Sequence, residues 1–106
     1  MTTFDKREEA FEKKFTIDEE LKFKSVARRN KLLGLWVAEK LGRSGAEADA
    51  YAKEVVAAEI EGGDAGVVRK AMGDLSAKGS AIAEGELSAK MVELLAVAIV
   101  QVKAGT

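Results

Sequence analysis

The chain of 106 residues contains no cysteine, no histidine and no proline, and each absence excludes a class of structure or chemistry. Without cysteine there is no disulfide framework and no thiolate nucleophile. Without histidine, the usual zinc sites and the Ser-His and Cys-His nucleophile arrangements are also excluded, so we expect neither a metal site nor an enzyme. Without proline, and with abundant Ala, Glu, Lys and Leu, the composition favours helix throughout.

The sequence also lacks an excess of charge of one sign and a long hydrophobic run. Seventeen basic and 18 acidic residues leave a net charge of −1, so no global field draws the chain to nucleic acid or to anionic lipid. The most apolar stretch, residues 91–102, is interrupted by Glu93 and Gln101. It is too short to span a bilayer, which takes about 20 apolar residues. The N-terminus lacks the apolar segment of a secretory signal. We expect a cytoplasmic protein without direct membrane insertion.

Apolar residues at helical spacing predict helices joined by short turns. Thr16 and Glu19 form a capping box that starts the first helix and leaves residues 1–16 as a separate arm, and Gly62 with Gly63 ends the second helix. We therefore predict an all-α fold, a four-helix bundle over residues 17–106, preceded by an N-terminal helical or partly disordered arm. The four expected helices cover residues 17–41, 46–61, 65–77 and 86–103.

Two helices carry further packing signals. Gly34 lies inside the first helix at some cost to its stability, which predicts close approach by another helix. Trp36 stands at helical spacing from apolar neighbours, so we expect it in the core and not stacked on a ligand. In the last helix, Val92 and Val100 add apolar surface outside the main stripe, which predicts that this helix is the central one.

The arm carries three phenylalanines on one helical face. Phe4, Phe11 and Phe15 stand at i, i+7 and i+11 among charges of both signs. Such a narrow stripe makes a helix that is marginal in isolation, but it suits an aromatic face that docks into a groove on another protein. The alternative is that the stripe packs on the chain's own bundle. Both interpretations can hold in turn, with the arm docked in the free protein and released to bind.

The segments MTTFDKREEAFEKKF, DEELKFK and ARRNKLLGLW together resemble the zeta subunit family. These proteins are small inhibitors of the F1 motor of the alpha-proteobacterial ATP synthase. The resemblance is specific over residues 1–42 and continues more loosely through AYAKEVVAAEI, VVRK and KMVELL. It implies a four-helix bundle whose N-terminal segment inhibits ATP hydrolysis by F1, at the catalytic alpha/beta interface and the central stalk. The protein would then lie peripheral to the inner membrane.

The resemblance also implies roles for residues of the arm. Phe4, Phe11 and Phe15 would be apolar anchors in the F1 cleft. Basic residues of the arm would pair with acidic groups of the motor, namely Arg7, Lys13 and Lys14. Its acidic residues would pair with basic groups there, namely Glu8, Glu9 and Glu12. The arm would keep the cleft from closing and block rotation in the direction of hydrolysis.

The first long helix has a basic face. Lys24, Arg28 and Lys31 stand at i, i+4 and i+7, and the simplest interpretation is a solvated surface. The alternative is an anion site for phosphates or for an acidic partner. The family's weak regulatory binding of ADP or ATP favours this alternative, and we assign Arg28, Arg29 and Lys31 to such a site. No cofactor is required.

Two other functions stay open. The chain is also compatible with a helical adaptor that uses the arm on some other protein, and with a nucleic-acid-binding module that uses the basic face. The net charge and the lack of aromatic residues interleaved with that face argue against nucleic acid as a partner.

Overall fold

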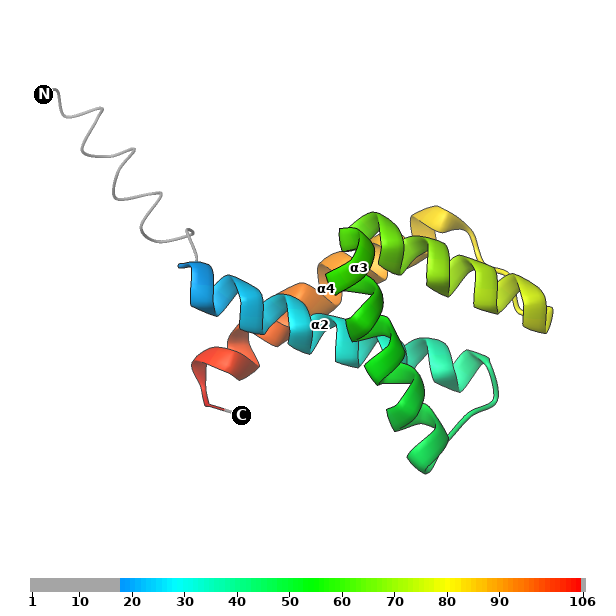
Figure 1. Ribbon diagram of the computed structural model, residues 1–106, viewed down its shortest axis with the longest axis horizontal. Coiled ribbons are helices and arrows are strands. Elements are labelled where there is room, and N and C mark those ends of the chain that lie inside the picture. Colours follow the sequence, from blue (N-terminus) through cyan, green and yellow to red (C-terminus); the bar gives the residue numbers. More distant parts are fainter. Residues whose placement is uncertain (1–17, 106) are drawn as a thin grey trace, which may run out of the picture.

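The computed structural model describes residues 18–105, and within that range the fold is all-α with three helices and no strand. Helices α2 (Glu19–Lys40), α3 (Gly45–Lys78) and α4 (Glu84–Lys103) follow one another in the chain. Helix α2 lies at the centre, because α3 and α4 both pack extensively on it and only slightly on each other. Figure 1 shows α4 crossing α2 obliquely as the chain runs back, and the first half of α3 lying across α2.

Helix α3 bends sharply at Gly63. This residue has φ 65° and ψ −161°, a backbone conformation that is essentially restricted to glycine. The two halves of α3 therefore run in different directions (Figure 1). The predicted break at Gly62 and Gly63 is thus present as a kink inside one helix, and the expected separate helix over residues 65–77 is the second half of α3. The described residues form three helices, so the expected count of four is not confirmed.

The helix ends follow from local chemistry. Asp18 is the N-cap of α2, and its Oδ1 accepts a hydrogen bond of 2.8 Å from the Leu21 amide. Helix α2 therefore begins two residues later than predicted, with Asp18 in the capping role that was expected of Thr16, which lies outside the described residues. Ser44 is the N-cap of α3, but its side chain makes no capping hydrogen bond. Helix α4 starts at Glu84 and ends at Lys103, the predicted end.

The apolar core lies where α2 faces the other two helices. Gly34 is a point of close approach between α2 and α3, because a Cβ atom built there would lie 2.5 Å from the Cα of Ala52. This confirms the close helix contact predicted at Gly34. Trp36 is half-buried and packs against the core. The largest fully buried aliphatic side chains are Leu33, Val37, Val55, Val67, Leu75 and Leu87.

The prediction that the last helix is central is wrong. The side chains of Val92 and Val100 are 73% and 67% exposed. They stand outside the buried side of α4, which includes Leu87, Met91 and Ala98. The apolar surface of α4 therefore has one buried side and one side without a helix packed against it among residues 18–105.

Candidate functional site

Helix α2 carries the three residues predicted to bind an anion, and the structure separates them. Successive residues of an α-helix point about 100° apart. Arg29 is only 4% exposed and faces the kink of α3, whereas Arg28 and Lys31 line a groove on another side of the helix. Two charged sites therefore need separate descriptions.

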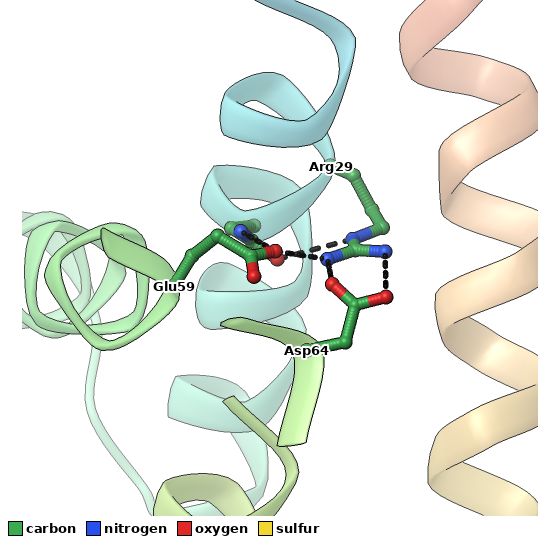
Figure 2. Close-up of polar contacts among 4 residues, drawn as sticks. Arg29, Glu59 and Asp64 are labelled. Carbon is green, nitrogen blue, oxygen red and sulfur yellow. Dashed lines mark hydrogen bonds and ion pairs between the residues drawn. The ribbon is translucent and has the colours of Figure 1, made fainter. Parts of the chain in front are cut away.

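The first site is an ion-pair network around Arg29. Its Nη2 lies 2.7 Å from Oε1 of Glu59 and 2.7 Å from Oδ1 of Asp64. A second, longer contact of 3.5 Å joins Nη1 to the other oxygen of Asp64. Asn30 completes the network, because its Oδ1 accepts from Arg29 Nε at 3.0 Å and its Nδ2 donates to Glu59 at 3.1 Å. Figure 2 shows the guanidinium held between the two carboxylates.

The network joins α2 to both sides of the kink. Glu59 lies before Gly63 and Asp64 directly after it, so the change of direction brings both carboxylates to one guanidinium. Burial raises the pKa of Glu59, and the neighbouring Asp64 carboxylate raises it further. Hydrogen bonding to Arg29 lowers the pKa of Asp64. Since the guanidinium is enclosed by these partners, the network serves to fix the kink and offers no open donor to a phosphate.

The second site is a groove with a cavity volume of about 870 Å³ between α2, the first half of α3 and the end of α4. Its charged residues are four cations and one carboxylate: Lys24, Arg28, Lys31, Lys53 and Asp49. Its remaining lining is apolar or small: Phe23, Ala27, Ala52, Val56, Val102 and Gly105. The groove therefore combines an excess of positive charge with an apolar floor.

Two contacts shape the positive side of this groove. Arg28 donates from Nη1 to Oε1 of Gln101 at 2.9 Å, which joins α2 to the end of α4. Lys24 pairs with Glu20 at 2.9 Å, but both side chains are largely exposed, so this ion pair is weak. Phe23 is 71% exposed. These residues suit a ligand that has an anionic part and an apolar part, and they supply no nucleophile or general base in a reactive setting.

Sequence reasoning found part of the groove. The i, i+4, i+7 spacing placed Lys24, Arg28 and Lys31 on one face, and the structure brings all three to the groove. It missed Lys53 and Val56, because nothing in the sequence shows which side of α3 faces α2. Trp36 lies elsewhere, with the ammonium groups of Lys40 and Lys90 4.6 Å and 5.4 Å from its ring centre. The predicted arm residues lie outside the described residues: Phe4, Arg7, Phe11, Lys14 and Phe15.

Two further findings concern residues 18–105 only. No group of three or more acidic, cysteine or histidine side chains is placed to hold a metal ion in this part of the chain. No helix found there is long and apolar enough to cross a membrane.

The comparison with family models decides the identity. A model of the ATPase inhibitor subunit zeta matches residues 1–101, which is nearly the whole chain. The chain belongs to this family. The zeta family consists of ATPase inhibitor subunits and not of enzymes, so an inhibitory role accounts for the absence of catalytic groups from the groove. The match also includes the arm, residues 1–16.

A solved structure agrees with the fold of this zeta family member. A protein described by a solution NMR structure is 50% identical, with a TM-score of 0.71, over 81% of this chain and 99% of the other. No curated protein matches the chain.

Proposed function

We propose that the protein inhibits ATP hydrolysis by the F1 sector of ATP synthase through its N-terminal arm. The arm inserts as an amphipathic helix at the catalytic alpha/beta interface and against the central stalk, where it blocks rotation. The observation that carries this proposal is the family match, which runs through the arm as well as the body. Bound in this way, the protein lies in the cytoplasm, peripheral to the inner membrane.

The N-cap of α2 supports the separation of an inhibitory arm from the helical body. Asp18 has an extended backbone, with φ −65° and ψ 165°, and its carboxylate holds the first turn of α2. A helix in the arm would therefore not continue directly into α2, and the arm can change direction at this joint. In this proposal Phe4, Phe11 and Phe15 are the apolar anchors. Arg7 and Lys14 pair with acidic groups of the motor.

Deletion of residues 2–15 tests the proposal. Because the deletion keeps Asp18 and all described helices, we expect a folded helical protein that no longer inhibits ATP hydrolysis by F1. The matched control is a full chain whose residues 2–15 are shuffled, so that composition and charge are kept and the phenylalanine stripe is lost. It should be as inactive as the deletion. Full inhibition by either variant would refute the role of the arm.

A single substitution tests the anchors. Truncation of a buried aromatic anchor at an interface hot spot costs about 2–4 kcal/mol. Phe11→Ala should therefore weaken inhibition about 30-fold or more, with little change in melting temperature. If the inhibition constant is unchanged, or if the melting temperature falls sharply, Phe11 is not an interface anchor.

We also propose that the groove binds ADP or ATP weakly, as a regulatory ligand and not as a required cofactor. Arg28 and Lys31 are suited to contact the phosphates, and the apolar floor near Phe23 is suited to the base. Arg29 is not kept in this proposal, because Glu59 and Asp64 occupy its guanidinium. Affinity should be weak, since no glycine-rich loop of the phosphate-binding type occurs in the sequence.

Titration of ADP into isotope-labelled protein tests the nucleotide proposal. Amide resonances of residues 24–31 and 52–56 should shift together and saturate. Lys31→Met should reduce the affinity, whereas Lys78→Met, at the far end of α3, should not. Shifts confined to other residues would refute this location, and no shifts at saturating ADP would refute nucleotide binding.

A further inference from the structure

We infer that the basic groove is also the resting site of the protein's own N-terminal arm. The free protein would hold its phenylalanine stripe against the groove floor and its acidic residues against the groove lysines. The docking itself needs only the arm and the body. That docking also keeps the arm away from F1, and so restrains inhibition, rests on the proposed function of the arm.

The first support is reach. The groove is lined by α2 from Phe23 to Lys31, a length of about 12 Å at the helical rise per residue. A helical stripe from Phe4 to Phe15 covers about 16 Å. Residues 16–18 lie between this stripe and α2, and a loop of about two to five residues suffices to join two antiparallel helices. Because α2 starts only at Glu19, the arm can turn back beside the same helix.

The second support is the shape and polarity of the groove. Phe23 leaves 71% of its surface exposed beside a hollow of about 870 Å³. Ala27, Ala52 and Val56 extend this apolar surface. A phenylalanine stripe would cover it, and the burial of apolar surface on both sides would stabilise an arm that is marginal as an isolated helix.

The third support is the order of charges around the stripe. On a helix, Glu8 and Glu12 stand three or four positions from the phenylalanines and flank the stripe on one side. Arg7 and Lys14 flank it on the other side by the same rule. The arm therefore has an acidic edge next to its apolar face. The groove has the complementary basic edge along its α2 wall, where Lys24, Arg28 and Lys31 stand, whereas its α3 wall carries one cation and one carboxylate, Lys53 and Asp49.

The exposed face of α4 is the competing surface. Val92 and Val100 are exposed there, and by helical spacing only one cation of α4, Lys103, shares their face. Lys90 lies on the side of Trp36 and pairs with Glu93 at 2.7 Å. This face also forms no part of the groove. The groove offers both an apolar floor and an excess of positive charge, so it is the better match to the arm.

Paramagnetic relaxation enhancement in the free, full-length protein tests the docking. The chain has no cysteine, so Ala10→Cys gives one site for a nitroxide label, and Ala10 lies away from the phenylalanine stripe on a helix. The amides of residues 49–56 in α3 are the decisive probes, because they are far from the arm in sequence. We expect strong broadening of these amides compared with a diamagnetic label.

Charge reversal provides the matched controls. Glu8→Lys with Glu12→Lys should lower the ratio of docked to free arm about tenfold, and the broadening in α3 should fall with it. Adding Lys24→Glu and Lys31→Glu should restore it, whereas adding Lys78→Glu, outside the groove, should not. Each variant should keep the amide dispersion of the folded protein, because all of these changes are at surface charges or in the arm.

Three results would overturn the inference. Broadening centred on residues 92–100 would place the arm on α4. Weak broadening spread over the whole body would show an arm that does not dock. Unchanged broadening after reversal of Glu8 and Glu12 would show that the groove lysines do not hold the arm. None of these measurements involves F1, so failure of the docking is distinct from failure of the inhibitory function.

Discussion

The contact between α2 and α3 at Gly34 predicts the outcome of one small substitution. In Gly34→Ala, the new Cβ would lie 2.5 Å from the Cα of Ala52 and 3.1 Å from its Cβ. The first of these atoms belongs to the backbone, so no rotamer change relieves the clash. The two helices must move apart, and the packing of Leu33 and Val55 on either side of the contact loosens with them.

Two opposing effects set the magnitude. Inserting a methyl group into a packed contact costs about 1–3 kcal/mol. Alanine is a better helix former than glycine, which returns about 1 kcal/mol. We therefore expect Gly34→Ala to lower the free energy of unfolding by about 1 kcal/mol, and by up to about 2 kcal/mol if the helices cannot relax. In a domain of this size, 1 kcal/mol corresponds to a shift in melting temperature of about 4–8 °C.

Gly73 provides the matched control. It lies inside the second half of α3, and a Cβ built there meets no heavy atom within 4 Å. Gly73→Ala should therefore stabilise the protein by about 0.5–1 kcal/mol through helix propensity alone. Urea unfolding followed by far-UV circular dichroism measures both variants. If Gly34→Ala is as stable as Gly73→Ala, then α2 and α3 do not meet closely at Ala52 and the packing described above is wrong.

Three more predictions concern buried polar groups. Arg29→Met should lower the free energy of unfolding by about 2–3 kcal/mol, because it leaves Glu59 and Asp64 without their cation. The double variant with Glu59→Gln should lose less stability than the sum of the two single variants. Additive losses in urea unfolding would contradict the network. Because burial raises the pKa of Glu59 above the unfolded value of 4.5, the folded state binds a proton more tightly, so this group's contribution to stability should fall as pH rises from 4.5 through the folded pKa. Asp64, whose pKa is lowered from 3.8, acts in the opposite sense at lower pH, and Glu59→Gln should remove only the first dependence in unfolding measured at several pH values. Tyr51→Phe should cost about 1 kcal/mol, since the buried hydroxyl donates to Asp74 at 2.8 Å; an unchanged melting temperature would show that this bond contributes nothing.

The positions of the helices were readable from local signals, with one exception. The predicted end of the last helix at Lys103 is confirmed, and glycines mark the turns. The exception concerns Gly63, where the sequence predicted a break between two helices. Whether a glycine ends a helix or bends it depends on the conformation of the residues that follow it, and here packing on α2 decides that conformation. The spacing of apolar residues in the sequence does not show this packing.

The site was less predictable than the fold, for a reason that involves packing. Helical spacing correctly brought Lys24, Arg28 and Lys31 together. It did not show that Lys53 would stand opposite them, because this requires the crossing of α3 over α2. Helical spacing also did not show that Arg29 lies on a buried side of α2. In the sequence, a buried arginine with two carboxylate partners cannot be told from an exposed one.

The Arg29 network and the groove share the first half of α3, so a substitution in one site can affect the other. Glu59, held by Arg29, lies only one to two helical turns after Lys53 and Val56 in the same half of α3. Loss of Arg29 would therefore displace the α3 wall of the groove without any contact between Arg29 and a ligand. Arg29→Met should lower ADP affinity and stability together, whereas Lys31→Met should lower affinity alone. Reduced nucleotide binding in an Arg29 variant is evidence of a phosphate contact only when the free energy of unfolding is unchanged.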